Sequence, residues 1–266
     1  MILNISHETS YSYDEPVSYT LQQLRLTPKR RAGQKVLNWN VEVTGGGIEL
    51  EFDDQHNNRV LLVKAKAGEK TIKIKAHGTV ETSDISGVTG KHGGYLPLWY
   101  FTRSTPLTTA GNQISELVAS FEPMKSSPLD CMHALSERIA DLIVYRTGRT
   151  DAETTAEEAM AKGKGVCQDH THVFLSTARL LGFPARYVSG YLMLNESIDQ
   201  EASHAWAEAY VPDLGWIGFD ISNRISPDSR YVPIATGLDY LETAPISGMR
   251  FGSGNESMIV NLQVQQ

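Results

Sequence analysis

The sequence is poor in cysteine, since its 266 residues include only Cys131 and Cys167. A secreted scaffold held by disulfides would carry more cysteines at this size, so we expect a reducing, cytoplasmic compartment. No apolar run approaches the roughly 18 residues that a membrane span needs. Residues 1–13 lack the basic start and apolar stretch of a signal peptide, and we expect no membrane partner.

The sequence also lacks an excess of positive charge. Its formal net charge is -7 and its pI is about 5.6. A nucleic-acid-binding protein usually shows a basic field, so we expect no nucleic-acid partner. Hydrophobic residues make up 41% of the chain, which is enough apolar material for one large domain or two modest ones.

The first hundred residues have the pattern of short β-strands. Residues 36–43 and 60–67 are strand-like apolar runs, and residues 71–75 alternate between polar and apolar side chains. Turn-forming segments at residues 45–47 and 55–58 separate these runs. Strands at this spacing predict a β-sandwich domain over residues 1–100.

The pattern changes to helices between residues 95 and 110, where we place a domain boundary. Residues 128–142 carry apolar side chains along one stripe, and residues 167–181 predict a second, buried helix. Three strand patterns follow, at residues 186–194, 204–211 and 216–220. A helix followed by an antiparallel meander predicts an α+β domain over residues 101–266, with a carboxyl-terminal extension.

Cys167 stands where the second of these helices begins, directly after a turn that contains two glycines. Unpaired backbone N–H groups and the positive end of the helix dipole favour a thiolate at such a place, and the same donors can hold an oxyanion. A cysteine taken alone is more often a small buried residue, and we assign that role to Cys131, inside an amphipathic helix. Cys167 is therefore the candidate nucleophile.

A nucleophilic thiol needs a base, and the base needs a group that orients it. His204 begins the run 204–210, whose odd positions are three alanines, so one face of this strand would let a helix pack closely. A hairpin centred on Pro212 would pair His204 with Asp220. Directly opposed residues project from the same face with Cβ atoms about 5 Å apart, where an aspartate can fix a histidine's tautomer.

Three segments of the second half resemble the core motifs of the transglutaminase-like superfamily, in the family's order. They are residues 165–191, with GVCQDHTH and GFPARYVSGY, residues 203–208 (SHAWAE) and residues 215–220 (GWIGFD). Residues 11–34 and the tail at 237–248 are similar to the β-rich amino-terminal domain and the closing segment of bacterial members.

The chain departs from the family pattern at two places. His170 and Thr171 replace an aromatic and a small residue, and Asn57 stands where the amino-terminal domain usually has a glycine. Neither position belongs to the three motif residues that the family uses for chemistry.

The resemblance implies a papain-like fold and a catalytic triad of Cys167, His204 and Asp220. Cys167 would attack an amide carbonyl of a peptide, a protein or a small molecule, and His204 would protonate the departing amine to leave a thioester. Water then gives hydrolysis, whereas a second amine gives transamidation; protein-glutamine deamidation is a further outcome. Because bacterial relatives are often described as candidate cysteine proteases or amidases, we expect a hydrolase without a cofactor.

Four more residues are expected to bind substrate. Tyr145 resembles a tyrosine ahead of the nucleophile in the family, and Gln168 is next to the nucleophile. Tyr191 and Trp206 would form walls of the groove, although an aromatic side chain on a strand more often belongs to the core.

Two other kinds of function stay open. Cys167, His170, His172 and His204 include zinc ligands, but Cys167 and His172 point apart on a helix, so we expect no metal. A binding module that kept the fold without the activity would lack part of the triad, and here all three positions are filled. Asp169 is expected to have a structural role, together with His172. The sequence gives no indication of the oligomeric state.

Overall fold

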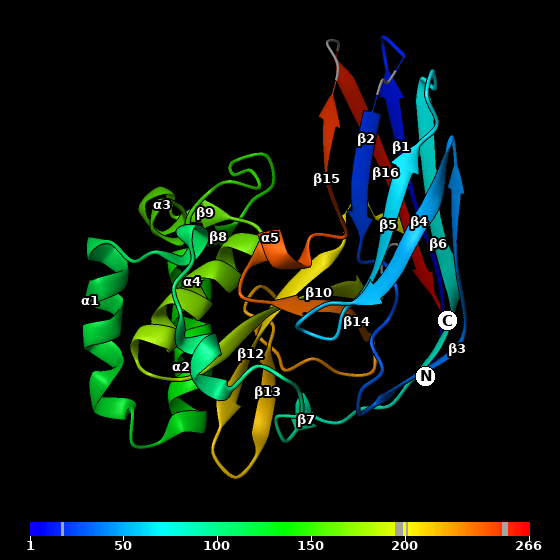
Figure 1. Cartoon of the computed structure of the whole chain (residues 1–266). Helices are drawn as coiled ribbons and strands as arrows, with labels where there is room; N and C mark the ends of the chain where they lie inside the picture. The colour runs from blue at the N-terminus through cyan, green and yellow to red at the C-terminus, as the bar shows by residue number, and fades with distance from the viewer. Residues whose placement is uncertain (17–18, 195–198, 201, 252–254) are drawn as a thin grey trace.

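The structure is a computed structural model that describes residues 1–16, 19–194, 199–200, 202–251 and 255–266. It has an α+β architecture, in which a β-sandwich packs against a sheet covered by helices (Figure 1). Among the described residues, no helix combines the length and the apolar content that a membrane span requires.

Two antiparallel sheets form the sandwich. The larger sheet has the order β11-β16-β1-β6-β3, with β1 at Ile2–Tyr13, β3 at Gln34–Thr44, β6 at Thr71–Thr82, β11 at Asp199–Gln200 and β16 at Glu256–Gln265. The smaller sheet has the order β15-β2-β5-β4, with β2 at Tyr19–Leu24, β4 at Gly46–Asp53, β5 at Arg59–Ala65 and β15 at Ile246–Phe251. The alternation predicted for residues 71–75 is confirmed, because Ile72 and Ile74 are fully buried in β6.

The last part of the chain returns to the sandwich. β15 pairs with β2 and β16 pairs with β1, so that Asn4 lies opposite Gln265 and the two termini are close together (Figure 1). Strands β15 and β16 therefore add to both sheets of the β-sandwich that we predicted over residues 1–100. The sequence limits of two domains, 1–100 and 101–266, stay a prediction.

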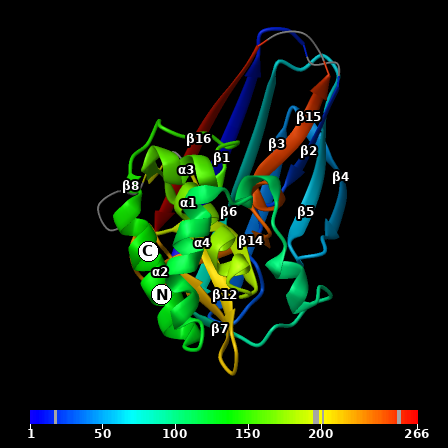
Figure 2. The same cartoon turned by 90° about the vertical axis from the view of Figure 1, so that its left-hand side faces the viewer.

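The second part of the fold is a third sheet with helices on one side (Figure 2). The sheet has the order β14-β10-β12-β13-β7, with β7 at Val88–Gly90, β10 at Ala185–Leu192, β12 at His204–Val211, β13 at Gly215–Phe219 and β14 at Tyr231–Gly237. The α-helices are α1 at Asn112–Phe121, α2 at Pro128–Leu142, α3 at Ala156–Lys162, α4 at Cys167–Leu180 and α5 at Tyr240–Thr243. Short 3₁₀ helices cover Leu98–Thr102, Pro106–Thr108 and Glu122–Met124, and β8 (Val144–Tyr145) pairs with β9 (Lys164–Gly165).

Helix α4 packs on the alanine face of β12, as the sequence predicted. Ala205, Ala207 and Ala209 share one buried cluster with Val173 and Phe174 of α4. Small side chains on the strand let the helix approach the sheet closely. Cys131 lies in the same cluster and is fully buried, in agreement with its expected structural role.

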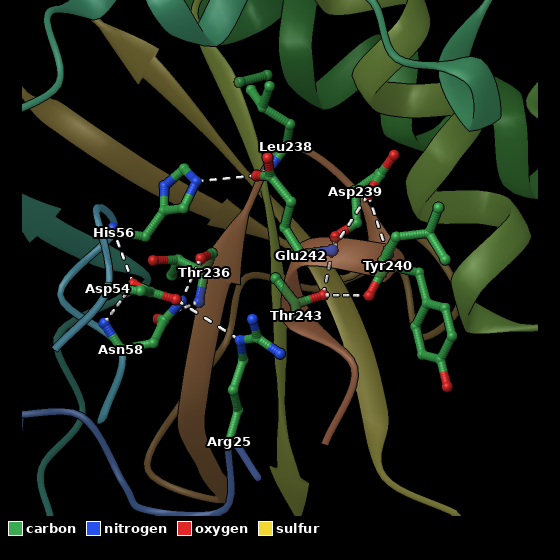
Figure 3. A network of polar contacts seen from close by, with 12 residues as sticks. Arg25, Asp54, His56, Asn58, Thr236, Leu238, Asp239, Tyr240, Glu242 and Thr243 are labelled. Carbon is green, nitrogen blue, oxygen red and sulfur yellow. Dashed lines mark hydrogen bonds and ion pairs between the residues drawn. The ribbon is translucent and has the colours of Figure 1, made fainter. Parts of the chain in front are cut away.

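The sandwich and the third sheet share polar contacts as well as an apolar cluster. The turn between β4 and β5 reaches β14, where the Asn58 side chain accepts a hydrogen bond from the Thr236 backbone N–H and donates one to its carbonyl, both at 2.8 Å. His56, from the same turn, lies 2.8 Å from the Glu242 carboxylate of α5 (Figure 3). Asn57 has a φ of 55°, a left-handed conformation that asparagine tolerates, which explains how it replaces the usual glycine.

Candidate active site

Cys167 is the first residue of α4, and the chain ahead of it is fixed by Asp169. The Asp169 carboxylate accepts hydrogen bonds from the Val166 backbone N–H and the Thr150 hydroxyl, each at 2.7 Å. Gly165 is needed here, because a Cβ would lie 2.7 Å from the Asp169 side chain. Asp169 therefore holds the turn that presents the Cys167 sulfur at the positive end of the helix.

The histidines of α4 are held by other contacts. His172 accepts a hydrogen bond from the Tyr240 backbone N–H at 3.2 Å, so it does not pair with Asp169. His170 bonds the Ser222 hydroxyl at 2.8 Å and the Ile143 carbonyl at 2.9 Å. Burial, together with the smaller effect of the nearby Arg179 charge, lowers the pKa of His172 to about 3, so this ring is neutral.

Asp220 lies beside His204, although in a different register from the one that we predicted. The hairpin is centred on Asp213 rather than Pro212, so the predicted pairing of His204 with Asp220 is wrong: Ala207 pairs with Phe219. The turn ends at Gly215, whose φ of 91° and tight contact with Gly90 admit only glycine. The pairing is therefore shifted by two positions, and an even shift keeps the side chains of His204 and Asp220 on the same face of the sheet. Nε2 of His204 lies 2.6 Å from Oδ2 of Asp220.

Asp220 is fully buried and holds more than the histidine. Its carboxylate accepts hydrogen bonds from the Tyr231 hydroxyl and the Asn223 side-chain amide, each at 2.7 Å. Burial alone would raise the pKa of Asp220, but the hydrogen bond and the charge of His204, with these neutral donors, lower it. The carboxylate is therefore ionised at neutral pH and oriented toward the imidazole.

The charges around His204 favour its protonated form. Burial lowers the pKa of His204, but the charge of a Cys167 thiolate and hydrogen bonds with Asp220 and Cys167 outweigh burial and raise it to about 10. Since Nε2 is bound to Asp220, Nδ1 is left for the sulfur. The arrangement can hold a thiolate and an imidazolium side by side, as nucleophilic and acid–base chemistry requires.

A pocket with a cavity volume of about 640 Å³ opens beside Cys167 and His204. Gln168 and Tyr145, two of the expected substrate-binding residues, line it. Sequence reasoning did not predict most of the other lining residues, which come mainly from strands and loops that meet only in the fold. They include Thr147, Tyr187, Ser189, Leu192, Leu194, Ser203, Ser222, Asn223 and Tyr240. Pockets of about 300–1,000 Å³ are typical of small-molecule sites.

Tyr191 and Trp206 do not line this pocket. Tyr191 is fully buried between the sandwich and the third sheet, where its hydroxyl lies 3.1 Å from Nδ1 of His7. Trp206 is 2% exposed and stacks on the His204 ring at a centroid distance of 6.2 Å. Both side chains are therefore core, and Trp206 acts on the site by supporting the imidazole.

No group of three or more possible metal ligands occurs among the residues that the structure describes. The side chains that suggested zinc have other neighbours, since His170 and His172 are held by the contacts given above. The described part of the chain thus offers no built site for a metal.

Residues 116–221, which contain Cys167, His204 and Asp220, match the model of the Transglutaminase-like superfamily, and residues 3–81 match that of the Bacterial transglutaminase-like N-terminal region. The chain belongs to the transglutaminase-like superfamily. The segment that matches the Bacterial transglutaminase-like N-terminal region thus holds strands β1 to β6 of the sandwich almost entirely.

Several relatives cover this transglutaminase-like chain to different extents. The crystal structure of a "Putative Cysteine Protease" from Cytophaga hutchinsonii is 25% identical and has a TM-score of 0.76, and the match covers 100% of this chain and 91% of that one. The uncharacterized protein ML0607 of Mycobacterium leprae is 25% identical over 98% of both chains. A protein-glutamine gamma-glutamyltransferase of Pseudomonas aeruginosa is 30% identical, over 33% of this chain and 15% of its own length.

Proposed function

We propose that this protein is a thiol-dependent acyl-transfer enzyme that hydrolyses amide bonds, with Cys167 as the nucleophile. The observation that carries the proposal is the 2.6 Å contact between the buried carboxylate of Asp220 and His204, which lines the same pocket as Cys167. A base, a group that orients it and a sulfur at a helix beginning are the parts that this reaction needs.

In the proposed reaction, the Cys167 thiolate adds to the carbonyl carbon of the amide and forms a C–S bond. Backbone N–H groups at the beginning of α4 stabilise the negative oxygen. The His204 imidazolium gives its proton to the nitrogen as the C–N bond breaks, and a thioester and a free amine result. A water molecule then attacks the thioester while His204 takes its proton, which releases a carboxylic acid and restores Cys167.

Hydrolysis is the proposed outcome because a solved structure that aligns with the whole chain is named as a "Putative Cysteine Protease". The local similarity to a glutamyltransferase gives a reason to test transfer to an amine as well. The substrate would be a peptide, a protein or a small amide that fits a pocket of about 640 Å³. The reaction needs a free thiol, which favours a reducing compartment such as the cytoplasm.

A direct test incubates the protein with a panel of peptide amides, with and without an added primary amine, and identifies the products by mass spectrometry. We expect conversion of amide to acid in wild type and none in Cys167→Ala, with Cys131→Ala as the matched control that keeps the activity. An amide linked to the added amine would instead indicate transamidation. Activity that persists in Cys167→Ala would refute the proposal.

A further inference from the structure

Tyr187 lies in the wall of the Cys167 pocket, on the central strand β10. Its side chain is only 1% exposed. The ring is held between two neighbours, since its centroid is 5.3 Å from that of His172 and 6.4 Å from that of Tyr240. A ring fixed in this way points its hydroxyl in one direction.

The Tyr187 hydroxyl has no hydrogen-bond partner among the described residues. The polar side-chain atoms that are sealed in the protein without a partner include Nδ1 of His172 and Oδ1 of Asp169, but not this hydroxyl. The small accessible part of Tyr187 therefore includes its oxygen, which faces the pocket. Because a buried phenol normally finds a partner, a free one in a pocket wall indicates that the partner comes from the pocket.

Tyr187 and Cys167 line the same pocket, and the charge of the sulfur acts on the Tyr187 hydroxyl. Burial raises the pKa of Tyr187 well above its ordinary value, and the charge of the Cys167 thiolate raises it further. The charge of Cys167 also raises the pKa of Tyr145, so exposure to water rather than charge distinguishes the two hydroxyls. Tyr187 is thus a protonated hydrogen-bond donor over the whole working range of pH, close to the reacting group.

We propose that the Tyr187 hydroxyl donates a hydrogen bond to the carbonyl oxygen of the acyl group that Cys167 attacks. The inference rests on the proposed function and adds a substrate-binding residue to it. Tyr145 also lines the pocket, but its side chain is 53% exposed, so water competes for its hydroxyl. A donor that is screened from water forms the stronger bond, which favours Tyr187.

The sandwich supports this donor through α5. Tyr240, which packs on the Tyr187 ring, belongs to α5, and its backbone N–H is bound to His172 on the nucleophile helix. The Asp239 side chain caps the helix, and Glu242 is bound by His56 of the sandwich, while the Tyr240 ring extends away from this network (Figure 3). Both neighbours of Tyr187 are therefore fixed by polar contacts outside the pocket.

The test compares two alkylating reagents that share a leaving group. Iodoacetamide has a carbonyl oxygen beside the carbon that the sulfur attacks, whereas iodomethane has no hydrogen-bond acceptor. In Tyr187→Phe we expect the rate at Cys167 to fall about three- to tenfold with iodoacetamide, the effect of one hydrogen bond, and to stay unchanged with iodomethane. Mass spectrometry of the Cys167 peptide gives both rates.

Tyr210→Phe is the matched control, since Tyr210 lies on β12 of the same sheet and does not line the pocket, so the ratio of the two alkylation rates should not change. Thermal unfolding verifies that each variant folds. If Tyr187→Phe fails to fold, the alkylation rate of Cys167 in the wild-type protein is compared with that of N-acetylcysteine for each reagent. We expect the ratio of these two rates to be larger for iodoacetamide than for iodomethane.

The outcomes separate the two claims. An unchanged ratio in Tyr187→Phe, with Cys167 still highly reactive, would overturn the hydrogen bond and leave the proposed function intact. A wild-type Cys167 no more reactive than an ordinary thiol with either reagent would overturn the proposed function itself.

Discussion

Replacing His204 with alanine is expected to lower the rate at which iodoacetamide alkylates Cys167 at pH 5 by about tenfold to a hundredfold. An isolated thiol with a pKa of about 8.5 is almost entirely protonated at this pH. In the wild-type protein His204 is protonated at pH 5, with its pKa raised to about 10, and we expect its positive charge to favour a thiolate at Cys167. The lower intrinsic nucleophilicity of such a thiolate offsets part of the difference, which limits the expected change.

Cys131 is the internal reference for this measurement. It is fully buried in α2, and burial and the charge of Glu122 raise the pKa of its thiol. We expect it to react slowly in both proteins, so that a general loosening of the fold would show as faster labelling of Cys131. Equal rates at Cys167 in wild type and His204→Ala would mean that the histidine does not activate the thiol.

Replacing Glu208 with alanine is expected to lower the free energy of unfolding by about 3–5 kcal/mol. The Glu208 side chain is 1% exposed and forms ion pairs with Arg31 and Arg186, the latter at 2.6 Å. Arg31 precedes β3 of the sandwich, whereas Arg186 and Glu208 lie on neighbouring strands of the third sheet. Loss of the carboxylate leaves the positive charges of Arg31 and Arg186 without their negative partner, and an uncompensated buried charge strongly destabilises the folded state.

Urea denaturation measures this difference, and Glu137→Ala is the matched control. Glu137 is also paired with an arginine, Arg224, but its side chain is 53% exposed, so the expected cost is below about 1 kcal/mol. Burial raises the pKa of Glu208, but the two arginines outweigh burial and lower it to about 2. A carboxyl group whose pKa is lowered by folding stabilises the folded state above its ordinary pKa, which is 4.5 here. The difference in the free energy of unfolding between wild type and Glu208→Ala should therefore decrease as the pH falls from 4.5 toward 2.

The sequence predicted the parts of the site that depend on periodicity. The glycine turn and the apolar run after it located the beginning of α4, and Cys167 is its first residue. The period of two along a strand predicted that His204 and Asp220 lie on one face of the sheet. The predicted hairpin register was wrong by two positions, but an even shift leaves both side chains on that face, so they still come into contact.

Features that depend on three-dimensional packing could not be predicted. The sequence pattern of β12 does not distinguish a side chain that lines the pocket from one that is buried in the core. Trp206 was therefore expected to line the substrate groove, whereas the structure buries it in an apolar cluster. The same limit applies to Tyr191, which is buried against the sandwich. Tyr187 belongs to the GFPARYVSGY motif, but its role at the site could not be predicted, because it depends on contacts with His172 and Tyr240, which are distant in sequence. The return of β15 and β16 to the sandwich likewise leaves no local signal.

The measurement that tests the central claim most directly is the pH profile of Cys167 alkylation in the wild-type protein, from pH 4 to pH 9, with Cys131 read in the same digest. The account predicts that Cys167 already reacts rapidly near pH 5, far below the range in which a free thiol with a pKa of about 8.5 ionises. A rate that rises only around pH 8.5, in parallel with a simple thiol, would contradict the thiolate–imidazolium pair and with it the acyl-transfer function.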